Sequence, residues 1–366
     1  MDLNITAKAP TTQSNSVGTE EDLNPSLPDP FMSVLIRSYN RLPHVLEILK
    51  VCMTQEYDSF EVIVVEQSTP AHWESHRAAL ERFDSRVRVV RSKRLRPPEA
   101  RNVGVAYCRG DVVLFIDDDD LPVGSNWISA HAKNYADPLC IGVGGRQVHQ
   151  INEKPHYRDM ERAYKRCLTR SFFLRGRKYI GINRVKKHVQ WLHGTNCSLR
   201  KSTIINLGGW YPHLNARGEE HSLFYKFQKT KKPGEYLMFD PQPKILRRFD
   251  ITGGVERHTM SFHTILIDRM QYYHWVVAEY FPLRFYGLYP FFLLYGFDFS
   301  LRYYRHNSSF TDVFWIHIFG QKSGQHLYIL HELVKLPIMA LRFLVTRKPV
   351  WDGQIAIPEG EQVNEV

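Results

Sequence analysis

The stretch VVLFIDDDD, residues 112–120, joins a short apolar run to four consecutive aspartates. Its apolar residues are β-branched, aromatic or leucine, and Gly110-Asp111 precedes them, so the run predicts a buried strand that ends at the carboxylates. Four like charges this close repel one another unless a cation lies among them. Hard divalent ions such as Mg²⁺ take carboxylate oxygens and commonly bring substrate phosphates with them.

The position of the aspartates adds to this expectation. In an open α/β sheet, ligands bind beyond the carboxyl ends of the strands, and residues 117–120 stand at such an end. The stretch therefore predicts a site for a metal-held phosphate compound. The alternative is a solvated turn closed by Leu121-Pro122, because Asp is a common turn residue.

Strands and helices alternate on both sides of this stretch. Short β-branched runs predict strands at 34–36, 62–65, 87–90, 111–116 and 141–148. Amphipathic segments predict helices at 42–55, 72–83, 98–108, 125–135, 201–207 and 219–229, before a last strand at 244–248. Alternation of this length predicts an α/β fold, with a mostly parallel, twisted sheet flanked by helices.

The character of the sequence changes at both ends of this alternating region. Residues 1–30 are rich in Thr, Ser, Asn and Pro and predict a disordered segment. We expect the globular domain at 31–255, a helical, aromatic-rich region at 256–350 and a tail at 351–366.

The aromatic-rich region contains a dense segment at 272–299, in which Glu279, Arg284 and prolines interrupt the apolar residues and disfavour a membrane span. Two interpretations stay open. One is an amphipathic segment at an acidic membrane surface, and the other is a helical subdomain packed on the core.

The overall charge favours anionic partners. The formal net charge is +10 and the isoelectric point is about 9.3, which suits phosphorylated small molecules, acidic lipids or nucleic acid. Four carboxylates at the expected site disfavour nucleic acid, because they would repel its phosphates. Five cysteines without a CxxC pair and the lack of a signal-peptide pattern predict a cytoplasmic protein, with peripheral association at the cytoplasmic face of the membrane as the alternative.

Two further blocks place polar residues where expected strands end. The block SVLIRSYNR, residues 33–41, ends in Ser38, Tyr39 and Asn40, which offer polar side chains and backbone groups after the first strand. The block VVEQST, residues 64–69, places Glu66 at the end of the second strand.

Two more blocks begin at helices or lie late in the chain. In PEARNVG, residues 98–104, Arg101 stands near a helix start, where its guanidinium can bind a diphosphate or brace the aspartates. Gly104 in the same helix permits close packing on the sheet. The late block runs from HGTNCSLR at 193–200 through GGW at 208–210 to GEE at 218–220. Its glutamates at a helix start also suit the helix dipole without any catalytic role.

In this order the four blocks resemble the family 2 glycosyltransferases over about residues 32–250. The resemblance implies the A-type nucleotide-sugar-binding fold. It also implies a role for each matching residue. Ser38, Tyr39 and Asn40 would lie near the nucleotide, and Glu66 would accept from a ring N–H of its base. Arg101 would bind the diphosphate, Asp117 and Asp118 would lie near the ribose and diphosphate, and Asp119 with Asp117 would bind the metal. Asp120 is expected to be a turn or supporting residue.

The same resemblance implies the chemistry of the late block. Glu220 is the candidate base that deprotonates an acceptor hydroxyl, and Glu219 is the second candidate. This chain departs from the family pattern at Arg37, where the family usually has Pro, at Gln67, where it usually has Asp, and at Ser222, where a further Asp is common.

The implied activity is transfer of one sugar from a nucleotide diphosphate sugar to a hydroxyl of a glycan or lipid-linked acceptor. It would depend on Mg²⁺ or Mn²⁺, invert the anomeric centre and serve polysaccharide biosynthesis. The Gln-x-x-Arg-Trp signature of processive synthases is absent, so we expect one sugar per encounter. The alternatives are a nucleotidyltransferase, which the lack of a glycine-rich loop after the first strand disfavours, and a nucleotide-sugar-binding protein with weakened turnover.

Overall fold

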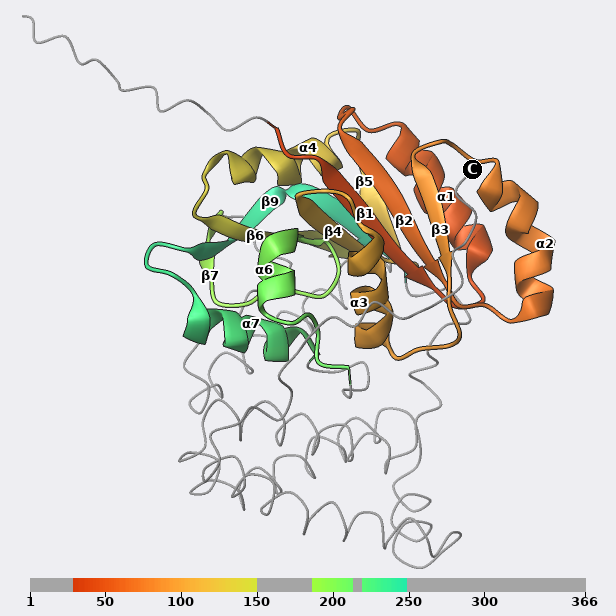
Figure 1. Ribbon diagram of the computed structural model, residues 1–366. Coiled ribbons are helices and arrows are strands. Elements are labelled where there is room, and N and C mark those ends of the chain that lie inside the picture. Colours follow the sequence, from red (N-terminus) through yellow and green to blue (C-terminus); the bar gives the residue numbers. More distant parts are fainter. Residues whose placement is uncertain (1–28, 150–185, 213–218, 249–366) are drawn as a thin grey trace, which may run out of the picture.

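The computed structural model describes residues 29–149, 186–212 and 219–248 (Figure 1). The expectations for the N-terminal segment at 1–30, the region at 256–350 and the tail at 351–366 therefore fall wholly or almost wholly outside the described residues. Within the described parts, no helix combines the length and apolar character that a membrane crossing requires.

The first half of the described chain builds the parallel part of the sheet. Four strands lie side by side in the order β3-β2-β1-β4 and all pair in parallel. They are β1 (Met32–Ser38), β2 (Phe60–Glu66), β3 (Val87–Arg91) and β4 (Val112–Asp117). Parallel pairing places their carboxyl ends along one edge of the sheet, so the loops that follow β1 and β2 in the first two sequence blocks lie at the same edge as the aspartates that follow β4.

The second half continues the same sheet in the order β8-β6-β9-β5, with β7 pairing to β9. These strands are β5 (Asp120–Val123), β6 (Cys140–His149), β7 (Lys187–Val189), β8 (Cys197–Arg200) and β9 (Tyr236–Arg247). β6 and β9 are parallel, whereas β8 is antiparallel to both β4 and β6, and β5 and β7 are antiparallel to β9. The expected α/β class is confirmed, and the sheet is mixed beyond β4.

Helices cover both faces of the sheet because its central strands are apolar on both faces. The helices are α1 (Leu42–Met53), α2 (Pro70–Glu81), α3 (Pro97–Tyr107), α4 (Trp127–Ala132) with a 3₁₀ turn at Lys133–Ala136, α6 (Lys201–Asn206) and α7 (Glu219–Thr230). One core cluster joins Val34 and Ile36 to α1, α2 and α4, and the other joins Leu35 to α3, α6 and α7.

Two close contacts fix α3, the helix that carries Arg101. A Cβ on Gly104 would lie 2.4 Å from Leu35 Cδ1 and 2.9 Å from Val65 Cγ2, so α3 packs directly on the sheet, as the sequence predicts. Asn102, also on α3, donates to the Trp210 carbonyl oxygen at 2.7 Å and accepts from the Trp210 amide at 2.8 Å. These two bonds tie the PEARNVG block to the late block.

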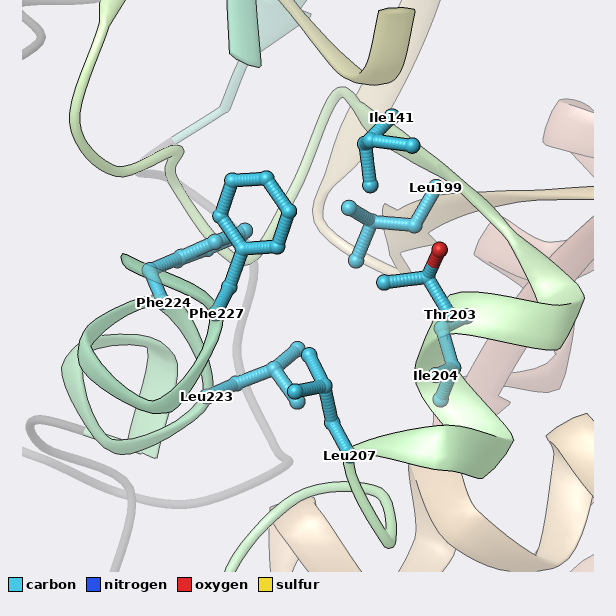
Figure 2. Close-up of a pocket in the computed structure, with 8 residues that line it drawn as sticks. All are labelled: Ile141, Leu199, Thr203, Ile204, Leu207, Leu223, Phe224 and Phe227. Atoms are coloured by element: carbon cyan, nitrogen blue, oxygen red, sulfur yellow. The ribbon is translucent and has the colours of Figure 1, made fainter. Parts of the chain in front are cut away.

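An apolar seam holds α7 against the sheet and α6 (Figure 2). Its α7 side chains are Leu223, Phe224 and Phe227, all at most 3% exposed, and they face Ile204 and Leu207 across the seam. Burying a side chain of this size contributes about 1.5–3 kcal/mol. The seam therefore fixes the start of α7, which begins at Glu219.

Candidate active site

The aspartate run bridges two strands. Asp117 ends β4, Asp118 and Asp119 form the turn, and Asp120 begins β5. One oxygen each from Asp117, Asp119 and Asp120 lies within 4.8 Å of the others. We call residues 117–120 the carboxylate group.

Four arginines surround the carboxylate group, and we call Arg37, Arg41, Arg101 and Arg247 the arginine group. They come from β1, the loop after β1, α3 and β9. The nitrogen–oxygen distances are 2.9 Å for Arg37–Asp117, 3.4 Å for Arg101–Asp117, 2.9 Å for Arg41–Asp118, 3.6 Å for Arg41–Asp119, 3.9 Å for Arg247–Asp119 and 3.8 Å for Arg247–Asp120. The four guanidinium charges offset the mutual repulsion of the aspartates.

Thr195 connects the carboxylate group to the late block. Its hydroxyl donates to Asp120 Oδ2 at 2.6 Å and accepts from the Asp117 amide at 3.1 Å. Thr195 is 1% exposed and Asp120 is fully buried. Asp120 is therefore held inside the cluster at the start of a strand. Of the two positions that the sequence leaves open for it, a turn or a supporting residue, the turn is excluded.

The donor set fits a divalent cation. Asp119 Oδ1 and Asp120 Oδ1 are buried and form no hydrogen bond with the described residues. A buried acceptor without a hydrogen bond costs about 1–3 kcal/mol, and more when it is charged. Oxygen ligands from several carboxylates suit Mg²⁺ or Mn²⁺, so Asp119 and Asp120, together with Asp117, could hold such an ion.

Burial perturbs two of these carboxyls. It raises the pKa of Asp118 to about 6, although Arg41 and Arg37 pull the pKa down. It raises the pKa of Asp120 to about 7, with Arg247 opposing the shift and the neighbouring aspartates adding to it. A cation among these oxygens would favour their ionised forms.

Arg101 lies between the carboxylate group and Glu220. Its Nη2 lies 3.4 Å from Asp117 Oδ1 and 3.3 Å from the Gly194 carbonyl oxygen. A Cβ on Gly194 would lie 2.9 Å from the same Nη2 and 2.7 Å from Glu220 Oε1. Glycine at 194 therefore leaves the space in which Arg101 and the Glu220 carboxylate approach each other. Glu219 begins α7, and its side chain lies outside the described residues.

The two loops after β1 and β2 are joined by their polar residues. Asn40 adopts a positive φ of 54°, its amide donates to Ser68 Oγ at 2.8 Å, and its side-chain oxygen accepts from the Thr69 amide at 3.0 Å. The guanidinium of Arg94 lies 4.4 Å from the centre of the Tyr39 ring. Ser38 Oγ is buried without a hydrogen-bond partner among the described residues.

Glu66 is bound by groups of the protein itself. It is fully buried, its Oε1 accepts from the Ser68 amide at 2.7 Å, and its Oε2 pairs with the Arg91 guanidinium. Arg91 stands directly opposite Glu66 in the parallel β2–β3 ladder. Both Glu66 oxygens therefore have partners within the protein, and its contact with a nucleotide base stays a prediction.

The structure thus brings the predicted residues Arg101, Asp117 and Glu220 together with the aspartates that follow β4. Sequence reasoning missed Arg41, Thr195 and Arg247 as partners of the carboxylates. The first two stand inside blocks that it did single out, at residues 33–41 and 193–200, which is the signal that could have found them.

Comparisons with known proteins bear on this site. The sequence profile described as Glycosyl transferase family 2 matches residues 33–208, which run from β1 to just beyond α6 and include the whole carboxylate group. An uncharacterised glycosyltransferase of Rickettsia conorii is 30% identical over 131 residues, 36% of this chain and 21% of that protein. The chain therefore spans about a fifth of that relative's length.

Other similar proteins differ more in sequence. A glucosyl-dolichyl phosphate glucuronosyltransferase of Haloferax volcanii is 21% identical over 222 residues, 58% of this chain and 68% of that protein. A mannosyltransferase structure from Pyrobaculum calidifontis, in complex with GDP-Man and Mn²⁺, aligns with a TM-score of 0.48 and 17% identity over 88% of this chain and 89% of that one. The profile match, together with the four blocks that it spans or adjoins, identifies residues 33–208 as a domain of the glycosyl transferase family 2 type.

Proposed function

We propose that this chain transfers one sugar from a nucleotide diphosphate sugar to a hydroxyl of a glycan or lipid-linked acceptor. The donor's diphosphate lies at the carboxylate group, with Mg²⁺ or Mn²⁺ held by Asp119 and its neighbours. When bound, the ion neutralises the charge that builds on the departing diphosphate. The arginine group supports the same role, since guanidinium donors suit phosphate oxygens.

The transfer step uses Glu220 as the base. Its carboxylate takes the proton of the acceptor hydroxyl, and the oxygen attacks the anomeric carbon from the face opposite the diphosphate. The bond from that carbon to the diphosphate oxygen breaks, and the nucleoside diphosphate leaves with the bonding electron pair. The configuration at the anomeric carbon is therefore inverted. One sugar is added per encounter.

The observation that carries the proposal is the approach of Glu220 and the carboxylate group around Gly194. Arg101 reaches Asp117 Oδ1 at 3.4 Å, and both its Nη2 and Glu220 Oε1 border the same point beside Gly194. A base and a site for the leaving diphosphate must lie this close, because the acceptor and the leaving group stand on opposite sides of one carbon.

Two observations support the acceptor class, the name of one relative and the net charge of the chain. The Haloferax relative is named for a dolichyl phosphate-linked glucose as its acceptor, which supports a lipid-linked acceptor here. The net charge of +10 supports peripheral attachment at an acidic cytoplasmic membrane face, where polysaccharide precursors are assembled.

A panel of nucleotide sugars tests the function. Each is incubated with the chain and Mn²⁺, and release of nucleoside diphosphate is measured with and without a chelator. We expect metal-dependent release from at least one donor, in wild type but not in Asp119→Asn. Release of pyrophosphate instead would identify a nucleotidyltransferase.

The base is tested separately. In Glu220→Gln we expect turnover to fall by about 10²–10⁴-fold, the usual contribution of general base catalysis, while donor binding measured by calorimetry stays within about threefold. Donor binding lost together with turnover would assign Glu220 to structure instead.

A further inference from the structure

The carboxylate group and the arginine group carry equal and opposite formal charges when every aspartate is ionised. The carboxylate group carries four negative charges when ionised, and the arginine group carries four positive charges within 4 Å of them. A divalent ion that enters this balanced cluster adds two positive charges close to guanidiniums. A diphosphate that follows brings the opposite charge. The cluster therefore favours the ion and the diphosphate together over the ion alone.

Arg37 is the arginine best able to change partner. Its Nη2 binds Asp117 Oδ1 at 2.9 Å, and its Nε is buried without a hydrogen-bond acceptor among the described residues. Its side chain is 20% exposed, so water or a ligand can reach part of it.

Arg101, the other guanidinium on Asp117, is more firmly held. Its side chain is only 3% exposed, and the same Nη2 that reaches Asp117 also donates to the Gly194 carbonyl oxygen. If Arg37 leaves, Arg101 still fixes Asp117. After Arg37 has left Asp117, its Nε–H, which lacks an acceptor among the described residues, can donate to a phosphate oxygen. A guanidinium can bind a phosphate through two N–H groups at once.

We propose that Arg37 is an exchangeable counter-ion, which holds Asp117 while no donor is bound and moves to the donor's diphosphate when the divalent ion takes the aspartates. This inference rests on the proposed function. Arg37 thus has two opposite effects: it weakens binding of the ion alone, and it strengthens binding of the diphosphate once the ion is present. A residue that served only to stabilise the fold would not separate these two affinities.

The experiment measures Mn²⁺ binding by electron paramagnetic resonance without nucleotide, and then UDP and GDP binding by calorimetry at saturating Mn²⁺. The variants are Arg37→Ala, Arg37→Met, which keeps much of the packing volume, and Arg37→Lys, which keeps the charge. Arg77→Ala is the matched control, because Arg77 forms a 2.8 Å ion pair with Glu81 on α2, outside the site.

We expect Arg37→Ala and Arg37→Met to bind Mn²⁺ alone at least about tenfold more tightly than wild type, because one nearby positive charge is gone. At saturating Mn²⁺ they bind the preferred nucleoside diphosphate at least about tenfold more weakly, the usual loss for one charged hydrogen bond. Arg37→Lys and Arg77→Ala keep the wild-type affinity for Mn²⁺ alone. A misfolded variant would bind Mn²⁺ more weakly, so tighter binding cannot arise from unfolding.

Two results would overturn the inference, and they differ in what else they overturn. If wild type binds Mn²⁺ and a nucleoside diphosphate, but the two uncharged variants bind Mn²⁺ alone no more tightly, only the counter-ion role of Arg37 is wrong. If wild type binds neither Mn²⁺ nor either diphosphate, the proposed function is wrong and the inference with it.

Discussion

Thr195→Val tests how the carboxylate group is held in place. The threonine hydroxyl serves two buried polar groups at once, the Asp120 carboxyl at 2.6 Å and the Asp117 amide at 3.1 Å. Valine keeps the shape of the side chain and replaces the hydroxyl by a methyl group. The variant therefore removes two hydrogen bonds without opening a cavity, and it leaves a donor and an acceptor unpaired in a region that is 1% exposed at Thr195.

The expected loss follows from these contacts. An unpaired buried group costs about 1–3 kcal/mol, and a carboxyl stands at the upper end of that range. We expect Thr195→Val to lower the free energy of unfolding by about 3 kcal/mol. Because Asp120 also loses its orientation, Mn²⁺ should stabilise the variant less than it stabilises wild type.

Urea denaturation followed by tryptophan fluorescence, with and without Mn²⁺, measures both effects. Thr195→Ser keeps the hydroxyl and should retain most of the stability. Thr230→Val is the matched control, since the exposed Thr230 hydroxyl donates to the Lys226 carbonyl oxygen at 2.9 Å and its loss should cost less than about 0.5 kcal/mol. A Thr195→Val protein within about 0.5 kcal/mol of wild type would refute the reasoning.

Three further predictions concern the scaffold of the site. Gly104→Val should lower the free energy of unfolding by at least about 2 kcal/mol in urea denaturation, because a Cβ there would already lie 2.4 Å from Leu35; no loss would contradict direct packing of α3 on the sheet. Leu223→Ala should cost about 2–5 kcal/mol by the same assay, as it opens the seam under α7, and a smaller loss would mean that the seam does not hold that helix. Burial lowers the pKa of His131 from 6.5 to about 4, so the unfolded chain takes up a proton before the folded one as the pH falls. The contribution of His131 to the free energy of unfolding is then lost between pH 6.5 and pH 4, by up to about 3 kcal/mol. It is measured as the difference in the free energy of unfolding between wild type and His131→Gln across that pH range. A difference that stays constant with pH would contradict a neutral buried imidazole.

The neutral state of His131 follows from its partners. Its Nε2 lies 3.1 Å from Asn196 Oδ1 and its Nδ1 lies 2.9 Å from Ser198 Oγ, which also accepts from the Tyr135 hydroxyl at 2.8 Å. An N–H at Nε2 and a lone pair at Nδ1 satisfy both contacts without a second proton. Asp118 and Asp120 have raised pKa values, so they change the free energy of unfolding in the opposite direction over the same pH range. Both wild type and His131→Gln contain these aspartates. The difference in the free energy of unfolding between the two proteins therefore reports His131 alone.

The sequence predicted the fold where a long, regular pattern was present. The first four strands and the helices between them appear within a few residues of their expected bounds. The short strands β5, β7 and β8 have four residues or fewer, too few to show a period. Pro122 reads as a turn signal, yet it lies in β5 at the edge of the sheet, where a missing N–H is tolerated.

The site was predictable in part for the same reason. Strand ends and blocks located Asp117–Asp120, Arg101 and Glu220, but partners distant in sequence depend on how the chain folds back. Thr195 lies 75 residues from Asp120, and no local pattern links them. The Glu66–Arg91 pair is different, since it follows from the register of two neighbouring parallel strands and could be inferred once that register was known.

The central claim is that the aspartates after β4 hold a divalent ion that binds the diphosphate of a sugar donor. The most direct measurement is calorimetric titration of UDP and GDP into wild type and Asp119→Asn, each with Mn²⁺ and after chelation. We predict that wild type binds at least one of the two with Mn²⁺ and loses most of that affinity on chelation, while folded Asp119→Asn shows no such dependence. Nucleotide binding that is equal with and without Mn²⁺ in wild type would contradict the account.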